Sequence, residues 1–416
     1  MIEINKDQLA ERFMKYVQVD TQSDPNGTSF PTTEKQKDLS KILLKELKEL
    51  GLQAETDEFG YVYSSIPSNS SKNNIPPICF CSHVDTAPDC SGTNVKPILH
   101  KNYDGNDIVL PDDNTQVLSA KVSPYLKNHI GADIITASGH TLLGADDKSG
   151  IAIIMQLADY MVKNPAVIHG EIRIVFTPDE EVGKGTAKID MKKAGAVYGY
   201  TLDGGEAGSL EDETFSADGA TITVHGVIAH PGYAKDTLVN AMKIAGEILD
   251  ALPKNEWSPE TTDGMQGFVH PVSLNGIAEK TTIGFIVRDF RTEKLAEHHD
   301  RLKKIAEAIV AKHKGASMEY TPSEQYRNMK DILVQHPQVA EYAAEAITRA
   351  GLKVKQESIR GGTDGSRLSY MGMPCPNIFT GMQNIHSKLE WIGVNDMAKA
   401  VETLVHLSQI WEEKTN

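Results

Sequence analysis

Four short polar clusters stand at the carboxyl ends of apolar, strand-like runs. They are HVD at 83–85, ADD at 145–147, PDEE at 178–181 and LDGG at 202–205. A fifth cluster, NIHS at 384–387, contributes a second histidine. Imidazole nitrogens and carboxylate oxygens together suit zinc, cobalt or manganese better than calcium or magnesium. The clusters therefore predict a metal centre, and the number of carboxylates favours two ions that share one bridging carboxylate.

Taken one at a time, these clusters also have ordinary interpretations. The pair His83 and Asp85 fits a polar strand end, and the adjacent acids of ADD fit a solvated loop. The glutamates of PDEE are more informative, because two carboxylates after a buried strand repel each other unless a cation neutralises one of them. The coincidence of all four clusters at strand ends favours a metal centre over four unrelated polar ends.

The clusters can meet only if the runs before them are strands of one sheet. Strand-like runs occupy 61–66, 78–82 and 134–136, and recur as EIRIVFT from 171 and AVYGYT from 196. Helical periodicity marks 7–17, 33–50, 148–162, 337–350 and 397–413, whereas 90–126 is rich in Asn, Asp, Pro and Gly and is predicted to be mostly loop. Alternating strands and helices indicate an α/β fold with a largely parallel sheet that is covered on both faces. Open sheets of this kind have their sites at the carboxyl ends of the strands.

The pattern changes from about residue 216. Alternating strand sequences at 217–232 and 281–290 accompany helical patterns at 237–252 and 293–314. A chain of 416 residues also exceeds what one hydrophobic core usually serves. We therefore predict an inserted α+β domain with an antiparallel sheet at 215–322. The α/β domain is then discontinuous and comprises 1–214 and 323–416.

Composition excludes several classes of partner. The net charge of -15 and the pI near 5.4 argue against nucleic acid and anionic membranes, because both require a basic face. Four cysteines are too few for a disulfide scaffold in a chain of this length. The first residues show neither a basic nor an apolar signal region, and no apolar run has the length of a membrane span. We expect a soluble cytoplasmic protein, and the net charge does not identify its substrate.

Seven motifs in their order along the chain resemble one family of hydrolases. They are SHVDTAPD, TLLGADDKSG, FTPDEEVGKG, LDGGE, AHPGYAKDTLVNA, RGGTDGSRLS and NIHS. They are similar to the co-catalytic zinc exopeptidases, which include aminoacylase, succinyl-diaminopimelate desuccinylase and glutamate carboxypeptidase. HPGYAKDTLVNA and RGGTDGS are specific to the peptidase T branch, whose members are tripeptide aminopeptidases. The resemblance runs nearly from end to end and implies a zinc-exopeptidase-like domain with an inserted lid.

The resemblance implies a role for each candidate metal ligand. His83 would bind the first ion, and Asp203 would complete that site. Asp146 would bridge the two ions. Glu181 and His386 would bind the second ion. The expected cofactor is therefore a pair of divalent ions, with zinc preferred and cobalt or manganese as alternatives.

Two further acids would serve the reaction. Asp85 would hold the ring of His83 through its other nitrogen. Glu180 would be the general base: it would take a proton from a water between the ions, the hydroxide would attack the scissile carbonyl, and the proton would pass to the leaving nitrogen. On a regular strand the two adjacent glutamates would point to opposite faces, so they could not bind one ion alike. The resemblance also implies a cis peptide bond between Asp146 and Asp147.

The inserted domain would contribute residues that contact the substrate. His230 resembles a lid histidine that stabilises the tetrahedral oxyanion; the alternative is a surface histidine at a strand end. Asn240, Arg288 and Arg360 would grip the peptide backbone or its terminal carboxylate, which arginine suits as a bidentate donor. A surface salt bridge or hydrogen bond is the alternative for each of these three residues.

The predicted function is a two-zinc aminopeptidase that releases the N-terminal residue from tripeptides. The alternatives within the same chemistry are a related two-metal dipeptidase, deacylase or carboxypeptidase, which would differ only in how the substrate is gripped. A non-catalytic binding protein is disfavoured, because Glu180 and all five ligand positions are present. A homodimer is one assembly that the sequence leaves open.

Overall fold

The computed structural model describes residues 2–415, which divide into two compact units. Unit 2 comprises Glu213–Asn328 and Ile359–Gly362, and unit 1 comprises the remaining chain. The predicted insert, 215–322, lies within unit 2. The short second segment contacts the rest of unit 2, where the Phe215 N–H donates to the Ile359 carbonyl at 3.1 Å. A four-residue segment of this kind has no periodicity by which the sequence could reveal it.

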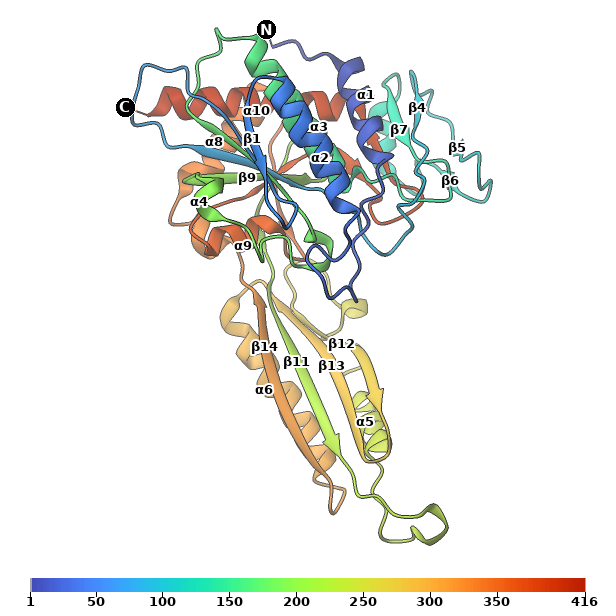
Figure 1. Cartoon of the computed structure of the whole chain (residues 1–416). Coiled ribbons are helices and arrows are strands. Elements are labelled where there is room, and N and C mark those ends of the chain that lie inside the picture. Colours follow the sequence, from blue (N-terminus) through green and yellow to red (C-terminus); the bar gives the residue numbers. More distant parts are fainter. Residues whose placement is uncertain (1, 416) are drawn as a thin grey trace. The chain divides into compact units, whose positions relative to one another are not determined.

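An eight-stranded mixed sheet forms the centre of unit 1, in the order β1-β2-β8-β3-β9-β16-β10-β15 (Figure 1). These strands are β1 (Gln53–Thr56), β2 (Val62–Ile66), β3 (Ile78–His83), β8 (Ile172–Thr177), β9 (Tyr198–Gly204), β10 (Ser209–Thr214), β15 (Lys355–Ile359) and β16 (Asn377–Phe379). The four central strands β8, β3, β9 and β16 run parallel to one another. The strands β1, β2 and β10 pair antiparallel. The predicted mixed, mostly parallel sheet is thus confirmed at its centre.

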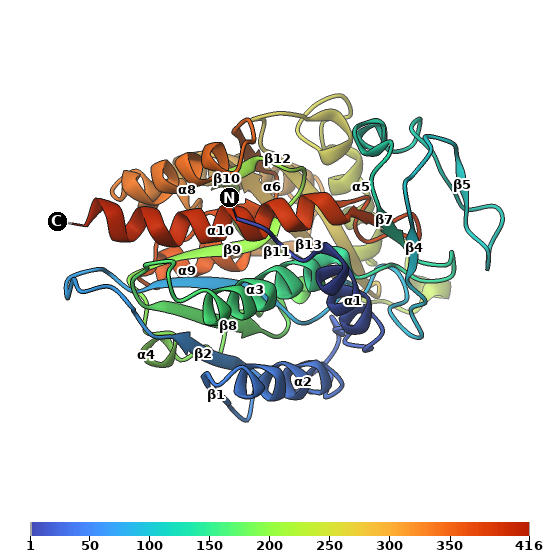
Figure 2. The same ribbon diagram turned by 90° about the horizontal axis from the view of Figure 1, so that it is seen from above.

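Helices cover both faces of this sheet, and its central strands β3, β8 and β9 are mostly buried between them. The helices of unit 1 are α1 (Lys6–Val17), α2 (Gln36–Glu49), α3 (Ala145–Lys163), α4 (Met191–Ala194), α7 (Lys330–Leu333), α8 (Pro337–Arg349), α9 (Asp364–Tyr370) and α10 (Val394–Lys414). Figures 1 and 2 show α3 and α10 on one face and α4 and α9 on the other. All six residues of β3 are buried. Along the described chain, every helix falls short of the length or apolar character that a membrane span requires.

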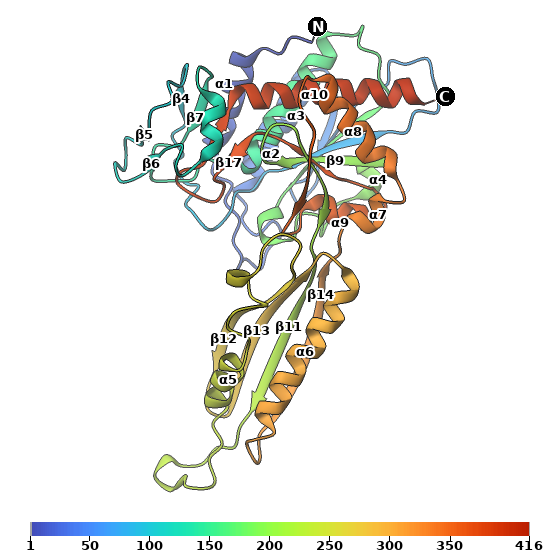
Figure 3. The same ribbon diagram turned by 180° about the vertical axis from the view of Figure 1, so that it is seen from behind.

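A smaller antiparallel sheet in unit 1 adjoins the segment that was predicted to be mostly loop. Its order is β17-β18-β7-β4, and a separate hairpin pairs β5 with β6 (Figure 3). The strands are β4 (Ile98–His100), β5 (Ile108–Val109), β6 (Val117–Leu118), β7 (Ile134–Thr136), β17 (Met382–Gln383) and β18 (Trp391–Gly393). The predicted strand at 134–136 is confirmed, and the strands within 90–126 are only two or three residues long.

A buried histidine–aspartate pair joins the 3-10 helix Pro124–His129, which precedes β7, to α10. His129 Nε2 lies 2.8 Å from Asp396 Oδ2, and the Tyr125 carbonyl lies 3.2 Å from His129 Nδ1. Burial lowers the pKa of His129, but the hydrogen bond and charge of Asp396, together with Tyr125 and Glu206, outweigh burial. The pKa of His129 therefore lies above its ordinary value of 6.5.

Unit 2 is an antiparallel sheet with two helices. The strand order is β12-β13-β11-β14. The elements are β11 (Ser216–His225), α5 (Ala241–Asp250), β12 (Phe268–Gly276), β13 (Lys280–Asp289), α6 (Thr292–Val310) and β14 (Ser317–Tyr326). Buried and partly exposed residues alternate along β13, and its apolar side packs with α5 and α6 into one core that includes Ile283, Phe285 and Leu302. The predicted α+β block with an antiparallel sheet is confirmed.

Candidate metal centre

Five side chains of unit 1 form two overlapping groups, each of which could hold a metal ion. The first group is His83, Asp146 and Asp203, and the second is Asp146, Glu181 and His386. Within each group, one ligand atom from every residue lies within 4.8 Å of the others. The structure thus brings together all five residues that the sequence suggested as ligands, and Asp146 is common to both groups.

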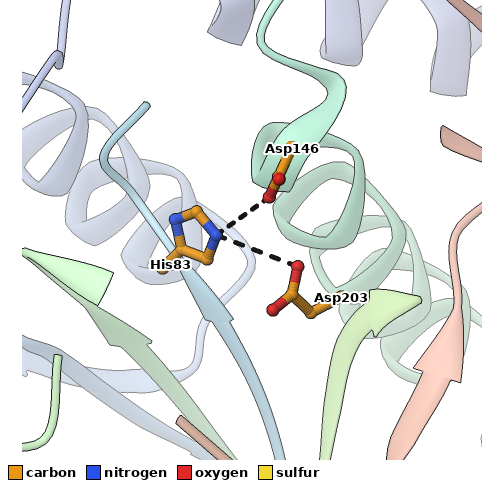
Figure 4. Close-up of side chains that lie close together, drawn as sticks. All are labelled: His83, Asp146 and Asp203. Atoms are coloured by element: carbon orange, nitrogen blue, oxygen red, sulfur yellow. Dashed lines mark hydrogen bonds and ion pairs between the residues drawn. The ribbon is translucent and has the colours of Figure 1, made fainter. Parts of the chain in front are cut away.

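The first group lies at the carboxyl edge of the main sheet. His83 is the last residue of β3, and Asp203 lies near the end of the parallel strand β9. His83 Nε2 is 3.0 Å from Asp146 Oδ1 and 3.9 Å from Asp203 Oδ1 (Figure 4). Burial raises the pKa of Asp203, as do the neighbouring acids Asp147 and Asp146. Carboxylates this close repel one another, so a cation between them would stabilise the group.

Asp146 stands where α3 begins, with its two carboxylate oxygens turned to different histidines. Oδ1 faces His83, and Oδ2 lies 3.2 Å from His386 Nε2. The backbone at Asp146 and Asp147 is not helical, and the peptide bond between them is cis, as the family resemblance implied. Burial acts to raise the pKa of Asp146, but the hydrogen bonds and charges of the two histidines together outweigh it and hold the pKa below its ordinary value.

The second group joins the loop after β17 to the turn after β8. His386 Nε2 lies 3.1 Å from Glu181 Oε2. Hydrogen bonds with Asp146 and Glu181 raise the pKa of His386 to about 11. Burial raises the pKa of Glu181 to about 7, and the nearby Asp146 acts in the same direction. Among the described residues, the buried Oε1 of Glu181 has no hydrogen-bond partner. This oxygen is therefore free to accept a cation.

Asp85 connects His83 to the two adjacent glutamates. Its carboxylate accepts the backbone N–H of Glu180 at 3.0 Å and that of Glu181 at 3.1 Å. His83 Nδ1 lies 3.1 Å from the Asp85 carbonyl and 3.3 Å from its Oδ1. A proton on Nδ1 would satisfy these acceptors and leave the lone pair of Nε2 directed toward Asp146. Asp85 thus orients the ring and also fixes the turn that bears both glutamates.

The two glutamates lie in a 3-10 turn, Glu180–Val182, and not on a strand. The expectation that strand alternation separates them is therefore wrong, because β8 ends at Thr177 and the chain turns at Asp179, whose φ is 58°. The turn itself gives the two side chains different surroundings. Burial raises the pKa of Glu180, His83 opposes this, and Asp364 adds to it. Glu180 belongs to neither group of candidate ligands.

Sequence reasoning missed Asp179, whose hydrogen bonds connect this turn to Thr32 and Gln36. Asp179 Oδ2 accepts the Thr32 N–H at 2.7 Å, and Oδ1 accepts the Gln36 amide at 2.7 Å. The Asp179 N–H donates in turn to Gln36 Oε1 at 3.0 Å. The signal was present in the sequence, because PDEE contains one more acid than the ligand and base roles require.

His230 and Asn240 lie in unit 2, where both make local contacts. His230 precedes the 3-10 helix Pro231–Tyr233, and its Nδ1 accepts the Gly232 N–H at 3.2 Å. Asn240 caps α5 by accepting the Met242 N–H at 2.9 Å. The contact of either residue with substrate stays a prediction.

Arg288 and Arg360 also belong to unit 2 and are engaged there. The Arg288 guanidinium donates to two backbone carbonyls and lies 5.5 Å from the centre of the Tyr326 ring. Arg360 donates to the Gly264 carbonyl at 2.5 Å and lies 5.0 Å from the centre of the Phe215 ring. These contacts fit a structural role for both arginines, and their binding of substrate remains a prediction.

Comparisons with known proteins find relatives that match nearly the whole length of the chain. A family model described as the peptidase dimerisation domain matches residues 213–314. A curated relative from Geobacillus thermodenitrificans, named peptidase T, is 45% identical over 412 residues, which cover 99% of this chain and 100% of the relative. The likeness to this relative therefore extends through both units.

Solved structures share the fold at lower identity. A tripeptidase from Staphylococcus aureus superposes with a TM-score of 0.77 at 21% identity, covering 99% of this chain and 100% of that one. A Bacillus subtilis protein described as a dinuclear metal-binding peptidase of the M20 family gives a TM-score of 0.66 at 15% identity, covering 99% of both chains. At these identities the comparison establishes the fold alone.

Proposed function

The chain belongs to the peptidase T family, and from this premise we propose that it is a metal-dependent aminopeptidase that releases the N-terminal residue from tripeptides. The observation that carries the proposal is the pair of ligand groups that share Asp146, with Glu180 beside them but in neither group. A binding protein would need the ligands but not the extra carboxylate. A hydrolase needs a base that the ions leave free.

The residues present fit two divalent ions. Each group offers one imidazole nitrogen and two carboxylates, a donor set that suits zinc, with cobalt or manganese as alternatives. The unpartnered, buried Oε1 of Glu181 is an oxygen that a cation would satisfy. His83 and Asp203 would hold one ion, Glu181 and His386 the other, and Asp146 would contact both.

When bound, the two ions would acidify a water molecule and polarise the carbonyl of the scissile bond. The residues of this chain would handle the proton. Glu180 would accept it from the attacking water and pass it to the leaving nitrogen, which departs as a free amine. Asp85 would keep Glu180 in place through the backbone hydrogen bond at 3.0 Å.

Unit 2 would act as a lid that completes the site. In this proposal the α/β domain, 1–214 and 323–416, carries the ions, and the lid, 215–322, brings His230 to the oxyanion. Asn240, Arg288 and Arg360 would contact the peptide. The match of residues 213–314 to the peptidase dimerisation domain supports a homodimer formed through the same lid.

Three substrates with the same residues test the proposal: a free tripeptide, its N-acetylated form, and the dipeptide that lacks the third residue. We expect the free tripeptide to lose only its first residue, with the other two substrates resistant, as followed by chromatography and mass spectrometry. Cleavage of the dipeptide would indicate a dipeptidase, and release of acetate a deacylase. Loss of the third residue would indicate a carboxypeptidase.

Metal analysis of the same preparation tests the cofactor. We expect two divalent ions per chain in the active protein and none in a Glu181→Gln/His386→Ala double variant at the second position. A preparation that hydrolyses tripeptides at full rate after dialysis against a strong chelator would contradict the proposal.

A further inference from the structure

Glu390 is a buried carboxylate that belongs to neither group of candidate ligands. It is 1% exposed and accepts three backbone N–H groups. Its Oε2 accepts from Leu143 and from Gly144, each at 2.7 Å, and its Oε1 accepts from Asp146 at 3.0 Å. Both oxygens are therefore used, and all three donors belong to the short segment that presents Asp146 at the start of α3.

The backbone of that segment is shaped to bind an anion. Gly144 has a φ of +83°, a conformation that turns successive N–H groups toward one point. An added Cβ at Gly144 would lie 3.3 Å from the Thr86 side chain, which leaves little room for another residue. A carboxylate at this point satisfies donors that would otherwise be buried without partners.

On its own side, Glu390 belongs to the hairpin that carries His386. The strands β17 and β18 pair Met382 with Ile392 and Gln383 with Trp391, so residues 384–390 form the connecting loop. The Glu390 N–H donates to the Ser387 carbonyl at 3.3 Å, and the Ser387 hydroxyl donates to the Asn384 carbonyl at 2.6 Å. These hydrogen bonds hold the loop in one conformation. A displacement of Glu390 would therefore also displace His386, which lies in the same loop.

We propose that Glu390 is a positioning residue that fixes the spacing between Asp146 and His386, and so sets the affinity of the ion that these two residues share. The inference rests on the two-metal function proposed above. Asp146 and His386 are 240 positions apart in the sequence, and their side chains lie 3.2 Å apart. The carboxylate of Glu390 ties their two segments together by three hydrogen bonds, and it does so without touching either side chain.

Glutamine at position 390 is the sharpest perturbation, because it keeps the size of the side chain. The amide has one acceptor oxygen, and its NH2 group would face a backbone donor. Residues that orient metal ligands typically change metal affinity by about 10–100-fold when they are replaced. We expect Glu390→Gln to lower the affinity for the shared ion by that factor.

The assay is a titration of the metal-free, full-length protein with Co²⁺, followed by visible absorption and by calorimetry. Wild type is expected to bind two ions. In Glu390→Gln the binding step that His386→Ala removes should lose more affinity than the other step. The kcat of Glu390→Gln should recover as the metal concentration is raised.

A matched control is Asp57→Asn, in the turn between β1 and β2. The Asp57 carboxylate also accepts two backbone N–H groups, from Phe59 at 3.0 Å and from Tyr61 at 3.1 Å. This variant should bind both ions with affinities within about twofold of wild type, well below the expected effect. An equal loss of affinity in the control would overturn the proposal, since it would show that any weakened turn has the same effect.

Other outcomes are equally decisive. Glu390→Gln with wild-type affinity for both ions overturns the positioning role and leaves the proposed function intact. Absence of ion binding in wild type overturns the proposed function and this inference with it. If the variant does not fold, hydrogen exchange of metal-free wild type decides: protected amides at Leu143 and Gly144 support the clamp, and rapid exchange at both contradicts it.

Discussion

Replacing Asp85 with asparagine should weaken the hydrogen bonds that hold Glu180 and Glu181 in position. The Asp85 carboxylate is fully buried and gives one oxygen to the Glu180 N–H and the other to the Glu181 N–H. Asparagine has the same size but only one acceptor oxygen. Its NH2 group would meet the second backbone N–H donor to donor, so one hydrogen bond is lost and one buried donor is left unsatisfied.

The free-energy cost of Asp85→Asn follows from one lost hydrogen bond and one unsatisfied buried donor. A hydrogen bond to a charged group contributes roughly 1.5–3 kcal/mol, and an unsatisfied buried donor costs roughly 1–3 kcal/mol. These two figures partly describe the same loss, so we take about 3 kcal/mol in total, which is about a 100-fold change in an equilibrium constant. Because Asp85 does not contact the residues proposed to grip the substrate, the loss should appear in kcat and leave KM nearly unchanged.

The assay compares steady-state hydrolysis of the free tripeptide by wild type and Asp85→Asn at saturating metal, with bound ions counted in both. Asp190→Asn is the control, because Asp190 also accepts two backbone N–H groups, at 2.9 and 3.3 Å, but at the exposed start of α4, where asparagine caps equally well. The reasoning fails if Asp85→Asn keeps both ions and retains kcat within about threefold of wild type, far from the loss of about 100-fold worked out above.

Three further results are expected. Glu180→Gln should lower kcat by about 10²–10⁴-fold while two ions remain bound, and a variant that keeps near-normal turnover would remove Glu180 as the base. Chelation should lower the unfolding temperature of unit 1, which contains all five candidate ligands, and leave the fluorescence transition of Trp257 in unit 2 unchanged. Because the pKa of His129 is raised in the folded protein, its pair with Asp396 stabilises most below about pH 6.5 and loses this effect as the pH rises. Urea unfolding should therefore show that Asp396→Asn costs about 1–2 kcal/mol near pH 5.5 and less near pH 8.5; an equal cost at both would contradict the assignment.

The central strands could be predicted because their own residues determine their burial. The segment 78–83 is apolar from Ile78 to Cys81, and such a run is what a strand covered on both faces requires. The strand β16 shows the limit of this reasoning. It has three residues, and its place in the sheet depends on pairing with β9, so that Asn377 lies beside Thr201. Nothing near position 377 in the sequence records that partner.

The candidate ligands could be predicted because metals select particular side chains, and side chains are what a sequence records. Glu390 could not be found in the same way. Its partners are the backbone N–H groups of Leu143, Gly144 and Asp146, which every non-proline residue possesses. The turn of Glu180 was missed for a related reason, since its geometry comes from backbone donors that converge on Asp85 from another segment.

The charges of the candidate ligands explain why two ions suit this site better than one. With both histidines neutral, the ionised carboxylates of Asp146, Glu181 and Asp203 carry three negative charges. One divalent ion would leave a net negative charge, which would repel both Glu180 in its basic form and an oxyanion forming on the substrate. Two divalent ions leave one positive charge to meet that oxyanion. The excess of acids over histidines is therefore what a hydrolase with a separate carboxylate base requires, and it disfavours a site that holds a single structural ion.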